Sequence, residues 1–305
     1  MQFVFSSGGV LMNAKVLPAS AGWQWWKSAF CLLRRAPVLL IASSLLAFVA
    51  FYAAIFAGVL VCALIASATF NGALVIGLLF LLAFMLFFPS FFLGLASIFR
   101  GVDRGEKASL ALFLQPIRER LLPLGALGLL ITVFSWIGNV LAFFVSSVNI
   151  VDLAQMSTGN IAGISSAVGA LGLFFLLNLT IYAVIMSASW FAFFLVGWRN
   201  VPILSAVSAS FTATLKNWAA FLTSLFVYIA GIIVAGIAGG LLVVAGATFG
   251  SILPEWLLAF AAFVLMIAAV AVLIPIIFGF WYFTYKTVFG EETPEPEQAG
   301  TASAS

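Results

Sequence analysis

Two acidic residues and their basic neighbours form the segment that comes closest to a reactive site. Asp103 and Glu106 lie in RGVDRGEK, residues 100–107. Carboxylates at this spacing can hold a metal ion, and arginines can hold a phosphate group. The chain has no His, no glycine-rich phosphate loop and no second acidic cluster, so we expect a solvated loop with local ion pairs. We therefore predict no catalytic residues, no metal site and no cofactor, and a protein that is not an enzyme.

Asn139 and Asn178 are a candidate polar pair inside long apolar runs. Side-chain amides in membrane helices commonly form hydrogen bonds between helices, worth about 0.6–2 kcal/mol, and we expect this role first. The alternative is that both amides line a cavity. Since no ionisable residue lies deep in any apolar run, proton relays, ion-coupled transport and voltage sensing are disfavoured.

The composition requires a membrane. Hydrophobic residues make up 65% and charged residues 7% of the chain, and the mean hydropathy is +1.27, whereas soluble domains carry about 25% charged residues. The net charge of +3 comes from Lys and Arg beside apolar runs rather than from one basic face, so no nucleic-acid partner is expected. Membrane lipids, including anionic ones, are the expected partners.

The apolar runs predict six membrane crossings. No charged residue occurs between Arg35 and Arg100, which is far longer than the about 20 residues of one crossing, and Asn71-Gly72 offers a turn inside the run. All 12 Lys and Arg then fall on one side, which the positive-inside rule makes cytoplasmic, together with both termini. We predict crossings at residues 38–65, 73–98, 122–146, 167–197, 218–246 and 256–285.

Short segments with apolar residues at helical spacing precede each pair of crossings. They cover residues 23–35, 109–120 and 199–216, and each contains basic residues at or near its end. In the first segment Trp23 and Trp26 share one face, which is typical of a helix lying at the membrane interface. We predict an all-α integral membrane protein whose six transmembrane helices form three helical hairpins in a parallel pseudo-repeat. Each hairpin is preceded by a short interfacial amphipathic helix, and the hairpins pack in one bundle.

The chain divides into three parts by composition. Residues 1–36 form a cytoplasmic segment with the first amphipathic helix, residues 37–289 form the transmembrane domain, and residues 290–305 form an acidic tail that is expected to be disordered. Basic residues at the junctions between amphipathic segments and crossings can hold their charges at headgroup depth. They make up a candidate anionic-lipid rim of Arg34, Arg35, Arg118, Arg120 and Lys216.

Glycines recur at small-xxx-small spacing around the fifth crossing. Gly236 is followed by Gly240, and Gly246 by Gly250. This spacing lets helix backbones approach closely, so packing against another helix of the chain is expected first. The alternative is a face that joins copies of the chain, or a different partner, into an oligomer.

Several segments together resemble a known group of proteins. RGVDRGE and WFAFFLV, with LQPIRERLLPLGALGLL between them, resemble an uncharacterised family of six-helix inner-membrane proteins from betaproteobacteria. The resemblance covers about residues 12–290. It implies the six-helix topology and a location in the bacterial inner membrane, and it implies no activity.

Two functions remain open. The first is a non-enzymatic membrane protein that organises lipids or partner proteins. The alternative is a transporter or flippase for an apolar or lipid-like substrate, which needs no buried charge. A cleft lined by Asn139, Asn178 or Tyr182 would favour the alternative, and a packed interior would favour the first function.

Overall fold

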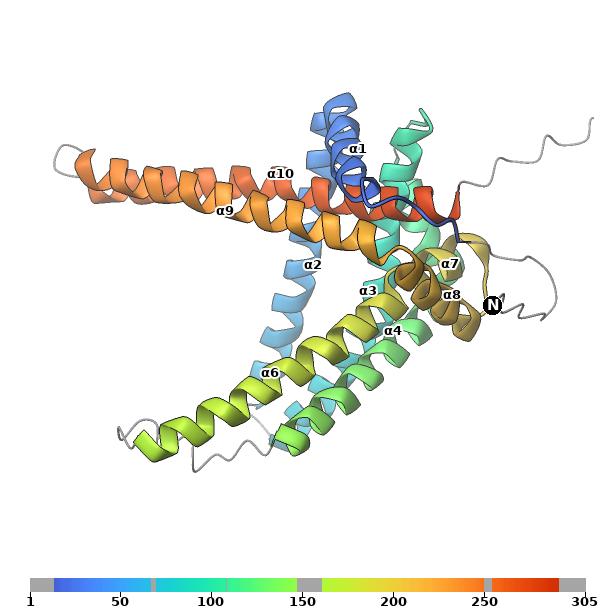
Figure 1. The fold of residues 1–305 in the computed structure, drawn as a ribbon, viewed down its shortest axis with the longest axis horizontal. Coiled ribbons are helices and arrows are strands. Elements are labelled where there is room, and N and C mark those ends of the chain that lie inside the picture. The colour runs from blue at the N-terminus through green and yellow to red at the C-terminus, as the bar shows by residue number, and fades with distance from the viewer. Residues whose placement is uncertain (1–13, 67–69, 108, 147–160, 250–253, 291–305) are drawn as a thin grey trace, which may run out of the picture. The chain divides into compact units, whose positions relative to one another are not determined.

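The computed structural model describes residues 14–66, 70–107, 109–146, 161–249 and 254–290 (Figure 1). Regular structure in these ranges is helical, without strands. The helices are α1 (Ala21–Arg35), α2 (Pro37–Ala66), α3 (Phe70–Asp103), α4 (Leu110–Ser146), α6 (Ile161–Ser189), α7 (Ala192–Arg199), α8 (Ile203–Lys216), α9 (Trp218–Phe249) and α10 (Glu255–Phe289). Six stretches are long and apolar enough to cross a membrane: Pro37–Leu64, Val75–Asp103, Leu110–Ser146, Val168–Arg199, Trp218–Leu241 and Ala259–Phe289. The chain is therefore a multi-pass α-helical membrane protein, as predicted.

The chain forms two compact units. Unit 1 comprises Met1–Pro37 with Lys216–Ser305, and unit 2 comprises Val38–Leu215. Unit 1 thus contains α1, α9 and α10, and unit 2 contains α2 to α8. The first helix lies in the same unit as the third predicted hairpin. A single bundle of three hairpins stays a prediction, and the acidic tail from residue 291 onward lies outside the described residues.

In unit 1, α1 packs on α9 and α10 through a face that the sequence pattern did not indicate (Figure 1). Trp25 is 1% exposed, and its ring lies 5.2 Å from the ring of Phe221 in α9 and 6.1 Å from that of Phe280 in α10. Its Nε1 atom donates a hydrogen bond to Thr287 Oγ1 at 2.7 Å. Trp23, by contrast, is exposed. Because a buried Trp with a bonded indole N–H anchors its helix strongly, protein contacts hold α1, and its place at the membrane interface stays a prediction.

A buried amide in unit 1 holds the segment that precedes α1. Asn217 is 1% exposed. Its Oδ1 atom accepts a hydrogen bond from the Leu17 backbone N–H at 2.8 Å, and its Nδ2 atom donates to the Lys15 carbonyl oxygen at 3.0 Å. The Lys15 N–H in turn donates to the Val288 carbonyl oxygen in α10 at 2.9 Å. One side chain thus satisfies two backbone groups of an otherwise extended segment.

Asn217→Ala is expected to release this segment. The substitution leaves two backbone groups without the amide, at a cost of about 1–3 kcal/mol, so trypsin should cleave after Lys15 faster than in the parent. Gln24→Ala is the matched control, because Gln24 is an exposed amide of the same unit. Limited proteolysis of the full-length protein in detergent measures the difference. Equal cleavage rates in parent and Asn217→Ala would contradict the prediction.

In unit 2, glycines let α3 and α4 approach each other closely. A Cβ atom at Gly94 of α3 would meet the carbonyl oxygen of Phe113, and one at Gly125 of α4 would lie 3.1 Å from the carbonyl oxygen of Leu86. The two backbones are therefore in near contact along the pair. α2 packs on α3 through aromatic rings. The centre of the Phe51 ring in α2 lies 5.2–5.6 Å from the ring centres of Phe84, Phe88 and Phe91 in α3.

α4 contains a break at Arg120, whose backbone angles are φ −132° and ψ 15°. Pro123 accounts for the break, because proline has no N–H to give to the carbonyl of Glu119 and its ring collides with that carbonyl. The break separates a short first part of α4 from the membrane span that follows. The sequence predicted a boundary at this place.

The fourth predicted crossing, residues 167–197, is not one helix. α6 ends at Ser189 and α7 begins at Ala192, with a turn between them and no proline nearby. The hydroxyl group of Ser210 in α8 enters the helix hydrogen-bond ladder there. An inserted side chain breaks a helix in this way. The predicted fourth crossing is confirmed, because Val168–Arg199 is long and apolar enough to span a membrane, and the break lies within this stretch.

Candidate functional site

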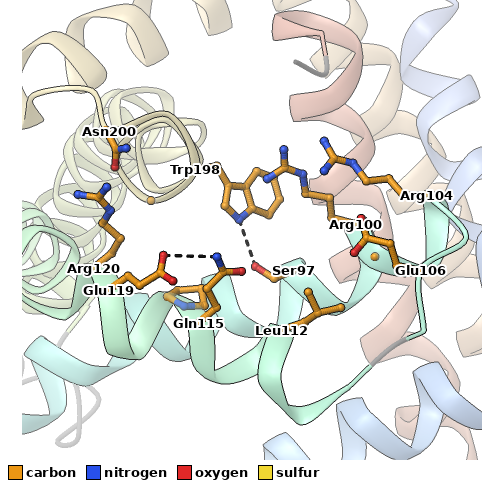
Figure 2. A pocket seen from close by; sticks show the side chains of 13 residues that line it. Ser97, Arg100, Arg104, Glu106, Leu112, Gln115, Glu119, Arg120, Trp198 and Asn200 are labelled. Atoms are coloured by element: carbon orange, nitrogen blue, oxygen red, sulfur yellow. Dashed lines mark hydrogen bonds between the residues drawn. The ribbon is translucent and has the colours of Figure 1, made fainter. Parts of the chain in front are cut away.

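A polar cavity of about 340 Å³ lies in unit 2, where α3, the first part of α4 and the end of α7 meet (Figure 2). Its walls combine basic, acidic and amide side chains with one indole ring. The residues around it are Ser97, Arg100, Gly101, Arg104, Glu106, Leu112, Gln115, Pro116, Glu119, Arg120, Gly197, Trp198 and Asn200.

Trp198 of α7 lies between the two charged sides of the cavity (Figure 2). Its Nε1 atom donates a hydrogen bond to Ser97 Oγ at 3.1 Å, and that hydroxyl donates to the Leu93 carbonyl oxygen at 2.9 Å. The Arg100 guanidinium carbon lies 4.6 Å from the centre of the Trp198 ring. A cation over an indole face is stabilised by about 0.5–2 kcal/mol. The indole ring is therefore fixed at one edge by Ser97 and covered on one face by Arg100.

Charges of both signs surround the cavity, with the positive sign in excess. Three arginines, Arg100, Arg104 and Arg120, face two glutamates, Glu106 and Glu119. Figure 2 shows Arg100, Arg104 and Glu106 on one side of Trp198, and Arg120 and Glu119 on the other. The guanidinium groups of such an arrangement can bind an anion through hydrogen bonds. The two glutamates repel negative charge and so limit the charge of the anion that can be bound.

Local backbone features place these side chains. The loop between α3 and α4 turns at Gly105, whose φ of +75° favours glycine, and the Glu106 N–H donates to the Gly101 carbonyl oxygen at 2.9 Å. α7 ends at Asn200 in the left-handed conformation, with φ 58°, which asparagine tolerates better than most residues. The break in α4 places Arg120 at the cavity wall.

The residues of the predicted lipid rim belong to both units. Arg120 lines the cavity, whereas Arg118 is exposed and does not. Arg34 is exposed and lies 4.7 Å over the ring of Phe30. Arg35 and Lys216 are exposed at the ends of α1 and α8. Since Arg34, Arg35 and Lys216 belong to unit 1, a continuous rim stays a prediction.

Sequence reasoning found only part of the cavity. It singled out RGVDRGEK as a conceivable phosphate site but favoured a solvated loop, and the structure places Arg100, Arg104 and Glu106 of that segment at one cavity. Asp103 is not among the lining residues. Trp198 was missed because it is distant in sequence, and only the packing of α7 brings it to Arg100.

Among the described residues, the two intramembrane asparagines bond within their own helices. Asn139 Nδ2 donates to the Ser135 carbonyl oxygen at 2.7 Å, and Asn178 Nδ2 donates to the Phe174 carbonyl oxygen at 2.9 Å. Each acceptor lies four residues earlier in the same helix, where a short polar side chain satisfies itself locally. The described cavities include neither amide, and Tyr182 is exposed.

The glycines of α9 make no close packing within the described chain. A Cβ atom at Gly236, Gly240 or Gly246 would meet no atom within 4 Å, and Gly250 lies outside the described residues. Within the described part of unit 1, the expected close packing against another helix is not found at these three positions. A face for an oligomer stays a prediction.

An apolar groove of about 320 Å³ lies elsewhere in unit 2. α2, α3 and the start of α4 form it, through Leu39, Ser43, Leu46, Ala47, Ala50, Phe91, Ile98, Ser109, Leu110 and Phe113. Phe113 faces this groove, whereas Leu112 and Gln115 of the same short helix face the polar cavity. The first part of α4 therefore separates a polar site from an apolar one.

Comparisons of the chain with protein-family models, curated proteins and solved structures found no match. The resemblance to six-helix inner-membrane proteins of betaproteobacteria stays a prediction. Function must therefore be inferred from the chemistry of the polar cavity.

Proposed function

We propose that this multi-pass protein is a non-enzymatic component of the bacterial inner membrane that binds the phosphate headgroup of an anionic lipid in the polar cavity of unit 2. One observation carries the proposal. Three arginines from α3, the loop after it and α4 surround a single cavity at the end of apolar, membrane-length helices. Arginine guanidinium groups bind phosphate oxygens through paired, charge-assisted hydrogen bonds.

The charges around the cavity favour a headgroup with one negative charge. The arginines outnumber the glutamates by one, which matches a single phosphodiester group. The neutral amides of Gln115 and Asn200, which also line the cavity, can hydrogen-bond to hydroxyl groups of the ligand. Phosphatidylglycerol has both features, a monoanionic phosphodiester and a headgroup with hydroxyl groups.

The position of the cavity along its helices supports a lipid ligand. α3 is free of charge from its start to Phe99, and Arg100 is its first charged residue. A cationic side chain at the end of a membrane span reaches the headgroup layer. We also propose that this end faces the cytoplasm, as the distribution of Lys and Arg favours. A negatively charged leaflet attracts each basic residue there by about 1 kcal/mol.

Arg120→Gln is expected to weaken phosphatidylglycerol binding about tenfold, because it removes one charge and its hydrogen bonds from the cavity. Arg118→Gln is the matched control, since it removes the same charge two residues away at an exposed position outside the cavity. Native mass spectrometry of the full-length protein titrated with phosphatidylglycerol or phosphatidylethanolamine measures binding. Equal losses in the two variants, or a parent protein without preference for the anionic lipid, would contradict the proposal.

Transport of a lipid-like substrate is the alternative function, and the same proteins test it. Purified parent protein is placed in vesicles that contain a fluorescent phospholipid, and exchange of that lipid between leaflets is followed. A binding protein should exchange lipid no faster than empty vesicles do. Faster exchange that Arg120→Gln slows would favour a flippase instead.

A further inference from the structure

The break between α6 and α7 contains a hydroxyl group from a third helix. In an unbroken helix the Phe191 N–H would donate to the Ser187 carbonyl oxygen, four residues earlier. Ser210 Oγ of α8 instead accepts from the Phe191 N–H at 2.9 Å and donates to the Ser187 carbonyl oxygen at 2.9 Å. Ser210 is 0% exposed. Its hydroxyl group therefore replaces a ladder hydrogen bond inside the protein.

The helix ladder is regular on both sides of this insertion. The Trp190 N–H donates to the Met186 carbonyl oxygen at 2.8 Å, and the Leu195 N–H donates to the Phe191 carbonyl oxygen at 3.0 Å. The interruption of the helix hydrogen-bond ladder is thus confined to the few residues beside Ser210. α7 starts directly after them at Ala192 and carries Trp198 to the cavity.

We propose that Ser210 is a positioning residue of the polar cavity. Its inserted hydroxyl group keeps α6 and α7 as two helices and so holds Trp198 against Ser97 and Arg100. Without the insertion, the Phe191 N–H and the Ser187 carbonyl can pair directly, and α7 then continues along α6 and carries Trp198 away from the cavity. The effect on the cavity is independent of its ligand, and only the effect on lipid binding rests on the proposed function.

The Thr214 hydroxyl group, which lies beside Ser210, limits the effect expected of a Ser210→Ala substitution. Thr214 Oγ1 lies 3.2 Å from the Ser187 carbonyl oxygen and 3.0 Å from that of Ser210. It can continue to serve the Ser187 carbonyl in Ser210→Ala. The substitution therefore mainly removes the hydroxyl group that accepts from the Phe191 N–H, and direct closure of the helix becomes the alternative for that donor.

The test compares full-length variants with and without the hydroxyl group. Ser210→Ala is the variant, Ser208→Ala is the control on the same helix because Ser208 is exposed, and Ser210→Thr restores a hydroxyl group. A cavity probe is added by Gln115→Cys in a background without Cys31 and Cys62, and its rate of modification by a charged thiol reagent is measured. Phosphatidylglycerol binding is measured by native mass spectrometry on the same proteins without the probe.

In Ser210→Ala the rate of thiol modification at the Gln115→Cys probe is expected to change about tenfold. Phosphatidylglycerol binding is expected to weaken by a similar factor. Both factors correspond to the free energy of one lost buried hydrogen bond. Ser208→Ala should match the parent, and Ser210→Thr should restore at least part of both values. An unchanged modification rate in folded Ser210→Ala overturns the positioning role. A parent that binds no lipid overturns the proposed function alone, because the probe still reports on the cavity.

Discussion

Gly22→Val is expected to detach α1 from α9 and to be among the most destabilising single substitutions in unit 1. A Cβ atom at Gly22 would meet the carbonyl oxygen of Ala220 and lie 2.7 Å from the backbone nitrogen of Ser224. Both atoms belong to the backbone of α9, so no side-chain rotation can make room. The helix must move away, and contacts such as the Trp26 hydrogen bond to Ser224 Oγ at 2.9 Å are lost with it.

The expected cost is about 3 kcal/mol, at the upper end for overpacking, because the obstruction is backbone. Thermal unfolding of the detergent-purified protein, together with trypsin cleavage after Lys27 of α1, measures it. Gly236→Val is the control on the same unit, since a Cβ atom there meets nothing within 4 Å. If the two variants unfold alike, the close contact between α1 and α9 is not present in the membrane protein.

Gly128→Val is the second substitution with a large expected effect, and it acts on unit 2. A Cβ atom at Gly128 would lie 2.5 Å from Pro89 Cγ and 3.0 Å from the Met85 carbonyl oxygen. Pro89 has no N–H, so it cannot donate to the Met85 carbonyl in α3, and the helix hydrogen-bond ladder is interrupted at that place. Gly128 of α4 fits against this irregular surface because it has no side chain.

Valine at Gly128 is expected to destabilise unit 2 by about 3 kcal/mol and to separate α4 from α3. The separation should also disturb the cavity, since α3 and α4 supply most of its wall. Gly172→Val on α6 is the control, because a Cβ atom there meets nothing within 4 Å. Thermal unfolding and phosphatidylglycerol binding are measured for both variants. A Gly128→Val protein with the stability of Gly172→Val would show that α3 and α4 do not pack at this position.

Glycines at small-xxx-small spacing in the sequence are not the glycines that lie in close helix contacts in the structure. Gly236 and Gly240 have the small-xxx-small spacing, yet neither is in close contact within the described chain. Gly22, Gly94, Gly125 and Gly128 each lie against the backbone of a neighbouring helix, and the sequence analysis singled out none of them. The reason is physical. Small residues permit close approach, but the partner helix decides where the approach occurs.

The number and approximate ends of the membrane helices could be predicted from the sequence, because both follow from local properties of the chain. The charge-free run between Arg35 and Arg100 requires two crossings. Pro123 requires a break in α4 just before it, and the break is found at Arg120. Neither inference depends on which other helix lies nearby.

Which helices are neighbours could not be predicted from the sequence and is seen only in the folded chain. α1 packs with α9 and α10 through Trp25, and Ser210 of α8 breaks the helix between α6 and α7. The cavity joins Arg100 to Trp198 across a long stretch of sequence. In a membrane, lipid and protein surroundings are almost equally apolar, so hydrophobic periodicity does not distinguish a face that meets lipid from one that meets another helix. Close packing, ring contacts and a few buried hydrogen bonds make that choice, and they exist only in the folded chain.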